Sequence, residues 1–121
     1  MIEWMNRSSF SLKVTLYSNN FTLNTHAAKY FLNAPYCMIG IDKEKMLIAL
    51  KPILQKEIEF EAIPYDQLHK VSIGNGYARI SNKSILSDLS LLLNTDVNGL
   101  KFQATYDKNE AMLLIDLMKP L

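Results

Sequence analysis

An internal duplication constrains the fold of this chain more than any other feature of its sequence. The stretch Lys70–Leu89, KVSIGNGYARISNKSILSDL, aligns without gaps with Lys13–Leu32, KVTLYSNNFTLNTHAAKYFL. Few positions are identical, but both copies predict a strand, a turn, a strand, a helix cap and a helix in the same order. The two copies are therefore expected to adopt the same local structure.

The first copy belongs to a longer unit, residues 11–52, that predicts the order ββαββ. Apolar residues alternate with polar ones from Leu12 to Leu16 and again from Phe21 to Leu23, as in a half-buried hairpin. Asn24 or Thr25 is expected to cap a short helix. A second hairpin is predicted from strands at 36–41 and 46–51, ended by Pro52. The apolar positions of the helix are Ala27, Ala28, Phe31 and Leu32.

The second unit, residues 70–120, repeats this plan. Its first hairpin turns at Gly74-Asn75-Gly76, where glycine accommodates positive φ. Ser81 or Asn82 is expected to cap the helix. The last hairpin, 100–106 and 112–117, again precedes a proline, Pro120. The predicted apolar side of the helix consists of Ile85, Leu86, Leu89, Leu92 and Leu93.

The connection between the units, residues 53–69, is acidic. It carries a net charge of −3, against +3 for residues 13–52 and +1 for residues 70–120. Ile58, Phe60 and Ala62 alternate with glutamates, which predicts a short strand with an acidic face. Such a strand would protect a sheet edge from aggregation. The alternatives are a docking strand for a partner and a mimic of nucleic acid.

Composition bounds the class of protein. The 121 residues, 49% hydrophobic and 21% charged with net charge +1, predict a single globular domain spanning 1–121. A lone cysteine, Cys37, forms no internal disulfide and is expected to be a small core residue. No apolar run is long enough to cross a bilayer, and the N-terminus lacks signal-peptide features. The expected location is cytoplasmic, and Trp4 is expected on an arm that packs on the domain, with a frayed end as the alternative.

No catalytic pattern emerges, and the chain is not expected to be an enzyme. His26 and His69 have no neighbouring nucleophile or carboxylate arrangement. The short Gly74-x-Gly76 pattern precedes a strand, so it indicates a turn and not a dinucleotide loop. No cofactor, metal or small-molecule substrate is expected.

A ββαββ unit with a short helix and a polar turn in its last hairpin resembles one half of the AbrB-type swapped-hairpin barrel. Two such units interlock their hairpins in that family, and MraZ-like relatives carry both units in one chain. The resemblance covers about residues 11–120 and implies a pseudo-twofold barrel of mostly β structure. Gly76 and Arg79 match the family's Gly-Arg run with two residues inserted, whereas Thr25 and Asn82 replace its proline. The Asp-x-x-x-Arg signature of MraZ-like proteins is absent.

The resemblance implies a small transcriptional regulator that contacts duplex DNA through basic residues on hairpins and helix starts. The matching residues here are Lys13, Lys29, Lys70, Arg79 and Lys83. Their charges suit phosphate contacts, and they equally suit a solvated surface, with Arg79 ion-paired to Asp88 or to an acid of the connection. The alternative function is a protein-interaction module on the same barrel, binding through a barrel edge, the Trp4 arm or the acidic connection. Two units either close one barrel or exchange hairpins with a second chain.

Overall fold

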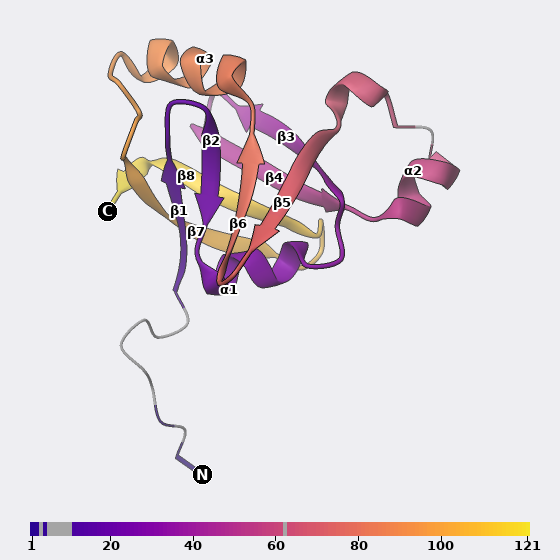
Figure 1. Cartoon of the computed structure of the whole chain (residues 1–121). Coiled ribbons are helices and arrows are strands. Elements are labelled where there is room, and N and C mark those ends of the chain that lie inside the picture. The colour runs from indigo at the N-terminus through magenta and orange to yellow at the C-terminus, as the bar shows by residue number, and fades with distance from the viewer. Residues whose placement is uncertain (3, 5–10, 62) are drawn as a thin grey trace.

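The computed structural model of the chain describes residues 1, 2, 4, 11–61 and 63–121. Within them eight strands close into an antiparallel barrel flanked by short helices (Figure 1). The strands are β1 (Leu12–Leu16), β2 (Asn20–Leu23), β3 (Tyr36–Asp42), β4 (Leu47–Ile53), β5 (His69–Gly74), β6 (Tyr77–Ser81), β7 (Lys101–Asp107) and β8 (Met112–Pro120). The helices are α1 (Thr25–Ala28), α2 (Gln55–Glu61) and α3 (Lys83–Leu93), with 3₁₀ helices at Lys29–Phe31 and Tyr65–Gln67. The prediction of a mostly-β chain with short helices is confirmed.

Hairpins from the two halves of the chain alternate around the barrel. The strand order is β1-β2-β6-β5-β3-β4-β8-β7, with β7 returning to β1. Each hairpin of one half therefore lies between two hairpins of the other half. Exchanging every strand for its counterpart (β1 for β5, β2 for β6, β3 for β7, β4 for β8) leaves the set of neighbouring strands unchanged.

The barrel interior is filled by the alternate residues that the sequence pattern assigned to it. In the early strands these residues include Val14, Leu16, Phe21, Leu23, Val71, Ala78 and Ile80, and all of them are buried. Ile48 and Leu50 on β4 meet Ile115 and Leu113 on β8 across the opposite side. Because side chains alternate between the faces of a strand, the neighbouring polar residues point outward.

The two helix starts are built alike, and each contacts a turn from the other half. Asn24 Oδ1 accepts a hydrogen bond from Ala27 N (3.1 Å), and Asn82 Oδ1 accepts one from Ile85 N (3.0 Å), so both predicted caps are confirmed. Asn82 N donates to the carbonyl of Asn19 in the β1–β2 turn. Thr25 Oγ1 donates to the carbonyl of Gly76 in the β5–β6 turn.

The late hairpins share a turn as well. Asp42 Oδ1 accepts hydrogen bonds from the two N–H groups that follow at Glu44 and Lys45, and Asp107 Oδ1 accepts the equivalent pair. Each turn closes on a residue with positive φ, Met46 (54°) and Ala111 (53°). The repeat therefore persists in backbone conformation where side chains differ.

The predicted acidic strand in the connection is wrong, because residues 55–61 form helix α2. Glu57 Oε1 accepts a hydrogen bond from Leu54 N (3.0 Å), while Leu54 O accepts from Glu57 N and Ile58 N. This reciprocal arrangement satisfies N–H groups that a first helical turn leaves free. Phe60 is 84% exposed, and Ala62, the last apolar position of the predicted strand, lies outside the described residues.

Pro52 does not end its hairpin as predicted, because β4 continues to Ile53, whereas Pro120 is the last residue of β8. These two strands pair with each other only as far as Leu50 on β4 and Asp116 on β8. A residue without an N–H group is tolerated in both places because the strand has lost one neighbour there.

Three apolar side chains are more exposed than predicted. Leu32 is 57% exposed, because the 3₁₀ turn that follows α1 advances faster per residue than an α-helix and rotates this side chain off the buried face. Leu92 is also exposed, at the rim of a cavity described below. Trp4 is 88% exposed, so it does not pack on the domain as predicted.

Candidate nucleic-acid interface

The two early hairpins form one continuous sheet, although they are far apart in the sequence. Strand β2 pairs with β6 from Asn20↔Ser81 to Leu23↔Ala78, so the order β1-β2-β6-β5 is uninterrupted. Figure 1 shows these four strands side by side. We call the outward side chains of these four strands the early-hairpin face.

The early-hairpin face is basic and contains no acid. Residues 12–23 and 69–81, which make up both hairpins with their turns, include Lys13, Lys70 and Arg79 but no aspartate or glutamate. All three cationic side chains are exposed. A surface of one sign attracts a polyanion, and no carboxylate of these two hairpins offsets the field.

A transverse row of side chains crosses this face at the level of Arg79. Lys101 on β7 is paired with Thr15 on β1, Thr15 with Thr22 on β2, and Thr22 with Arg79 on β6. Ser72 on β5 completes the row. Residues paired in this way point to the same side of a sheet. The row therefore has a cation at Lys101 and at Arg79 with two threonine hydroxyls between them.

Arg79 stacks on an aromatic ring and forms no ion pair with an acid of the described residues. Its guanidinium carbon lies 5.3 Å from the centroid of the Tyr77 ring, within cation–π range. A Cβ at Gly74 would collide with the Tyr77 ring, so glycine at this position allows the ring to lie against the strand. The predicted alternative, an ion pair between Arg79 and Asp88, is absent from the described part of the chain.

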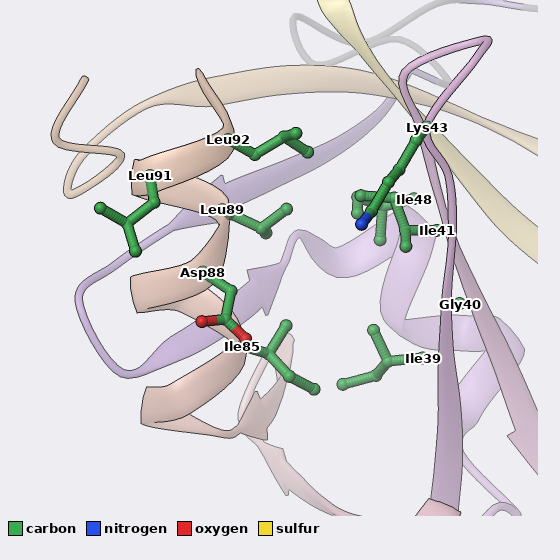
Figure 2. Close-up of a pocket in the computed structure, with 10 residues that line it drawn as sticks. All are labelled: Ile39, Gly40, Ile41, Lys43, Ile48, Ile85, Asp88, Leu89, Leu91 and Leu92. Carbon is green, nitrogen blue, oxygen red and sulfur yellow. The ribbon is translucent and has the colours of Figure 1, made fainter. Parts of the chain in front are cut away.

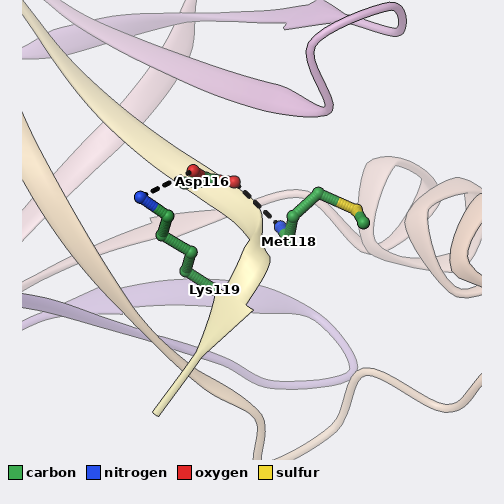
Figure 3. Close-up of polar contacts among 3 residues, drawn as sticks. All are labelled: Asp116, Met118 and Lys119. Atoms are coloured by element: carbon green, nitrogen blue, oxygen red, sulfur yellow. Dashed lines mark hydrogen bonds and ion pairs between the residues drawn. The ribbon is translucent and has the colours of Figure 1, made fainter.

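The sole ion pair among the described residues is at the end of β8 (Figure 3). Lys119 Nζ lies 3.9 Å from Asp116 Oδ2, and Met118 N donates to Asp116 Oδ1 at 2.9 Å. The lysine is largely exposed, so this pair contributes little to stability. The lysines and the arginine of the early-hairpin face are consequently free of ion pairs to described acids.

The structure brings together three of the five predicted DNA-contacting residues. Lys13, Lys70 and Arg79 lie on β1, β5 and β6 of one sheet. Lys29 follows α1 in a 3₁₀ turn, and Lys83 is the first residue of α3. These two helices lie at opposite ends of the barrel (Figure 1), so Lys29 and Lys83 flank the face and do not form part of it.

Sequence reasoning missed Thr15 and Thr22, which belong to this face, and Lys101, which borders it from β7. Lys101 reaches the early-hairpin face only because β7 pairs with β1 across nearly ninety residues of sequence. The two threonines could have been found from the sequence, because the alternation of apolar and polar residues places them on the outward side of their strands.

The other reactive groups do not form a catalytic arrangement. Cys37 is buried, as predicted, and burial raises the pKa of its thiol far above the ordinary value. Burial lowers the pKa of His69, whose Nδ1 lies 3.2 Å from Asn82 Nδ2. Because Asn82 Oδ1 already accepts from Ile85 N, the amide nitrogen donates to the imidazole. No group of three metal-ligating side chains gathers in the described ranges.

A second candidate site is an apolar cavity between α3 and the β3–β4 hairpin (Figure 2). Its volume is about 580 Å³. The strands contribute Ile39, Ile41 and Ile48, and the helix contributes Ile85, Leu89, Leu91 and Leu92, with Gly40, Lys43 and Asp88 completing the lining. Cavities of this size and polarity suit an apolar ligand or an apolar side chain of a partner.

Comparison with protein-family models, with curated proteins and with solved structures finds no match to this chain in any of the three. The resemblance to AbrB-type proteins therefore remains a prediction. Among the described residues no helix is both long and apolar enough to cross a membrane.

Proposed function

We propose that this protein is a small cytoplasmic regulator that binds duplex DNA through the early-hairpin face. One observation carries the proposal. The pairing of β2 with β6 joins two hairpins of like charge into a single acid-free surface that carries Lys13, Lys70 and Arg79. Without that pairing Lys13 would lie on one hairpin, and Lys70 and Arg79 on another.

The strand order supports the further proposal that the chain is a tandem swapped-hairpin barrel of the AbrB-like or MraZ-like kind. Each hairpin lies between hairpins of the other half, and the arrangement is unchanged when the halves are exchanged. This proposal is also supported by the matched caps at Asn24 and Asn82 and the matched turns at Asp42 and Asp107. In this proposal the duplicated sequence supplies both partners of what relatives assemble as a homodimer.

The proposed binding is mainly electrostatic. Lysines at the two sides of the face would contact phosphates and position the duplex. Arg79, held by Tyr77 near the middle of the sheet, would reach a phosphate or the edge of a guanine. Thr15 adds a hydroxyl that can donate to phosphate, whereas the hydroxyl of Thr22 already donates to Asn20 Oδ1. With about three phosphate contacts the affinity would be modest and strongly dependent on salt.

A fluorescence-anisotropy titration of a labelled duplex at several salt concentrations tests the proposal. The logarithm of the affinity should fall with the logarithm of the salt concentration with a slope of about −3. The triple variant Lys13→Ala, Lys70→Ala, Arg79→Ala should flatten that slope to near zero.

A matched control removes three lysines that lie outside the early-hairpin face. The variant Lys45→Ala, Lys56→Ala, Lys108→Ala changes the net charge by the same amount, with losses from α2 and from the two late turns. It should keep most of the slope of the native protein. Equal reductions of the salt slope in the two triple variants would show a nonspecific charge effect. Absence of DNA binding by the native protein at low salt would contradict the proposal.

The cavity beside α3 favours a second function, a protein-interaction module on the same barrel. Leu91, 81% exposed at its rim, is a large apolar side chain that no element of the described ranges covers. This function needs no DNA and is tested through the contact argued next.

A further inference from the structure

The cavity beside α3 exists because the gap between helix and hairpin is filled by large side chains at one end of the barrel and not at the other. The caps Asn24 and Asn82 are equivalent, so Tyr30, six residues beyond the first cap, corresponds to Asp88. The turn residues Asp42 and Asp107 are equivalent, so Tyr106 corresponds to Ile41. Each of these correspondences is fixed by equivalent hydrogen bonds from backbone N–H groups to a side-chain oxygen of the capping or turn residue.

Tyr30 and Tyr106 close the gap between helix and hairpin at the α1 end of the barrel. Their rings stack with centroids 3.8 Å apart and planes within 10°. At the α3 end the corresponding residues, Asp88 and Ile41, both line the cavity. An aspartate and an isoleucine cannot fill the volume of two stacked rings, so the second site is left open and apolar.

Two residues of opposite charge line this apolar cavity, and both are exposed. Asp88 belongs to α3, and Lys43 extends from the β3–β4 turn with its amino group directed toward the helix (Figure 2). Neither takes part in an ion pair among the described residues. Leu91 lies on the crest of the same helix and points away from the hairpin. An occupant with an apolar side chain, an acid for Lys43 and a base for Asp88 would therefore complement this cavity.

We propose that the occupant is a second copy of this chain, bound about a two-fold axis. Such an axis presents the same surface to itself, so each copy offers what the other lacks. Asp88 of one copy meets Lys43 of the other, and Leu91 of each enters the cavity of the other. In this arrangement the apolar Leu91 enters an apolar cavity and each Asp88 faces a Lys43, and the contact lies apart from the strands of the early-hairpin face.

Sedimentation velocity of the full chain over about 10 μM to about 1 mM tests this association. The native protein should shift from a 13.9 kDa monomer to a particle of twice that mass. Leu91→Asp should weaken the dimer by about 30-fold or more, as expected when a central apolar anchor is lost. Met118→Asp, the same kind of change at another exposed residue, should leave it unchanged.

Charge reversal distinguishes a two-fold contact from any other. Asp88→Lys and Lys43→Glu should each remain monomeric when alone. Mixed together they should form a heterodimer, because the first variant presents lysine at both positions and the second an acid at both. A native chain that stays monomeric throughout the range overturns the proposal. A dimer whose affinity is unchanged by Leu91→Asp also overturns it. The same holds if the two charge-reversed variants fail to associate on mixing.

Discussion

At the scale of single residues, His69 connects two parts of the fold through its imidazole. It begins β5, and its Nδ1 accepts a hydrogen bond from the side chain of Asn82, the residue that caps α3. The same amide group accepts from Ile85 N. A protonated imidazole has no acceptor to offer, so the bond exists only with neutral histidine.

Acidification should therefore destabilise the fold through His69. Burial lowers the pKa of His69 in the folded state below its ordinary value of 6.5, so the unfolded chain takes up the proton first. The stabilisation is complete above pH of about 6.5 and is lost as the pH falls through the lower, folded pKa. Urea unfolding between pH 8 and pH 5 should show this loss in the native protein.

The matched variant for that measurement is His69→Gln, which retains a polar side chain at the position and keeps His26. Its stability should change less between these pH values than that of the native protein. Identical pH profiles for the two proteins would exclude His69 as the source.

At the scale of elements, the sequence predicted those parts whose signals are local. The alternation in Leu12–Leu16 and the caps at Asn24 and Asn82 act over a few residues, and the structure has them where expected. Helix α2 was missed because its glutamates alternate with apolar residues, as in a strand. The decisive interaction, Glu57 reaching back to the N–H group of Leu54, begins at a residue that rarely caps helices.

Helix α2 should depend on that backward hydrogen bond. Glu57→Ala removes the acceptor for Leu54 N and should reduce the stability of the helix by about 0.5–1 kcal/mol. Glu57→Gln keeps an acceptor oxygen and should lose less. Hydrogen exchange of the α2 amides measures both, and equal protection in all three proteins would contradict this account of the helix.

At the scale of the whole molecule, strand neighbours depend on contacts that no local pattern encodes. Lys101 lies beside the early-hairpin face only through the pairing of β7 with β1. The cavity beside α3 depends on which residues replace the Tyr30–Tyr106 stack at the other end. The candidate basic residues could thus be chosen from the sequence. Which of them lie together on one face and which lie at the two ends of the barrel could not be predicted from it.

The alternation of hairpins predicts that neither half of the chain folds alone as a monomer. Every hairpin has both of its barrel neighbours in the other half, so an isolated half would expose four unpaired strand edges. Peptides covering residues 11–54 and 63–121 should each lack native near-ultraviolet circular dichroism as monomers. Mixing them should restore it. A monomeric half with native-like packing would contradict the interleaved architecture.

The central claim is that the early-hairpin face binds duplex DNA, and NMR mapping tests it most directly. Amide chemical shifts of the ¹⁵N-labelled full chain would be followed while a short duplex is added at low salt. The changes should concentrate in β1, β2, β6 and β5, with Arg79 and its row neighbours Thr22 and Ser72 among the largest, and should vanish at high salt. Strands β4 and β8, on the opposite side of the barrel, should remain unaffected. Changes centred on β4 and β8, or no changes at all, would contradict the account.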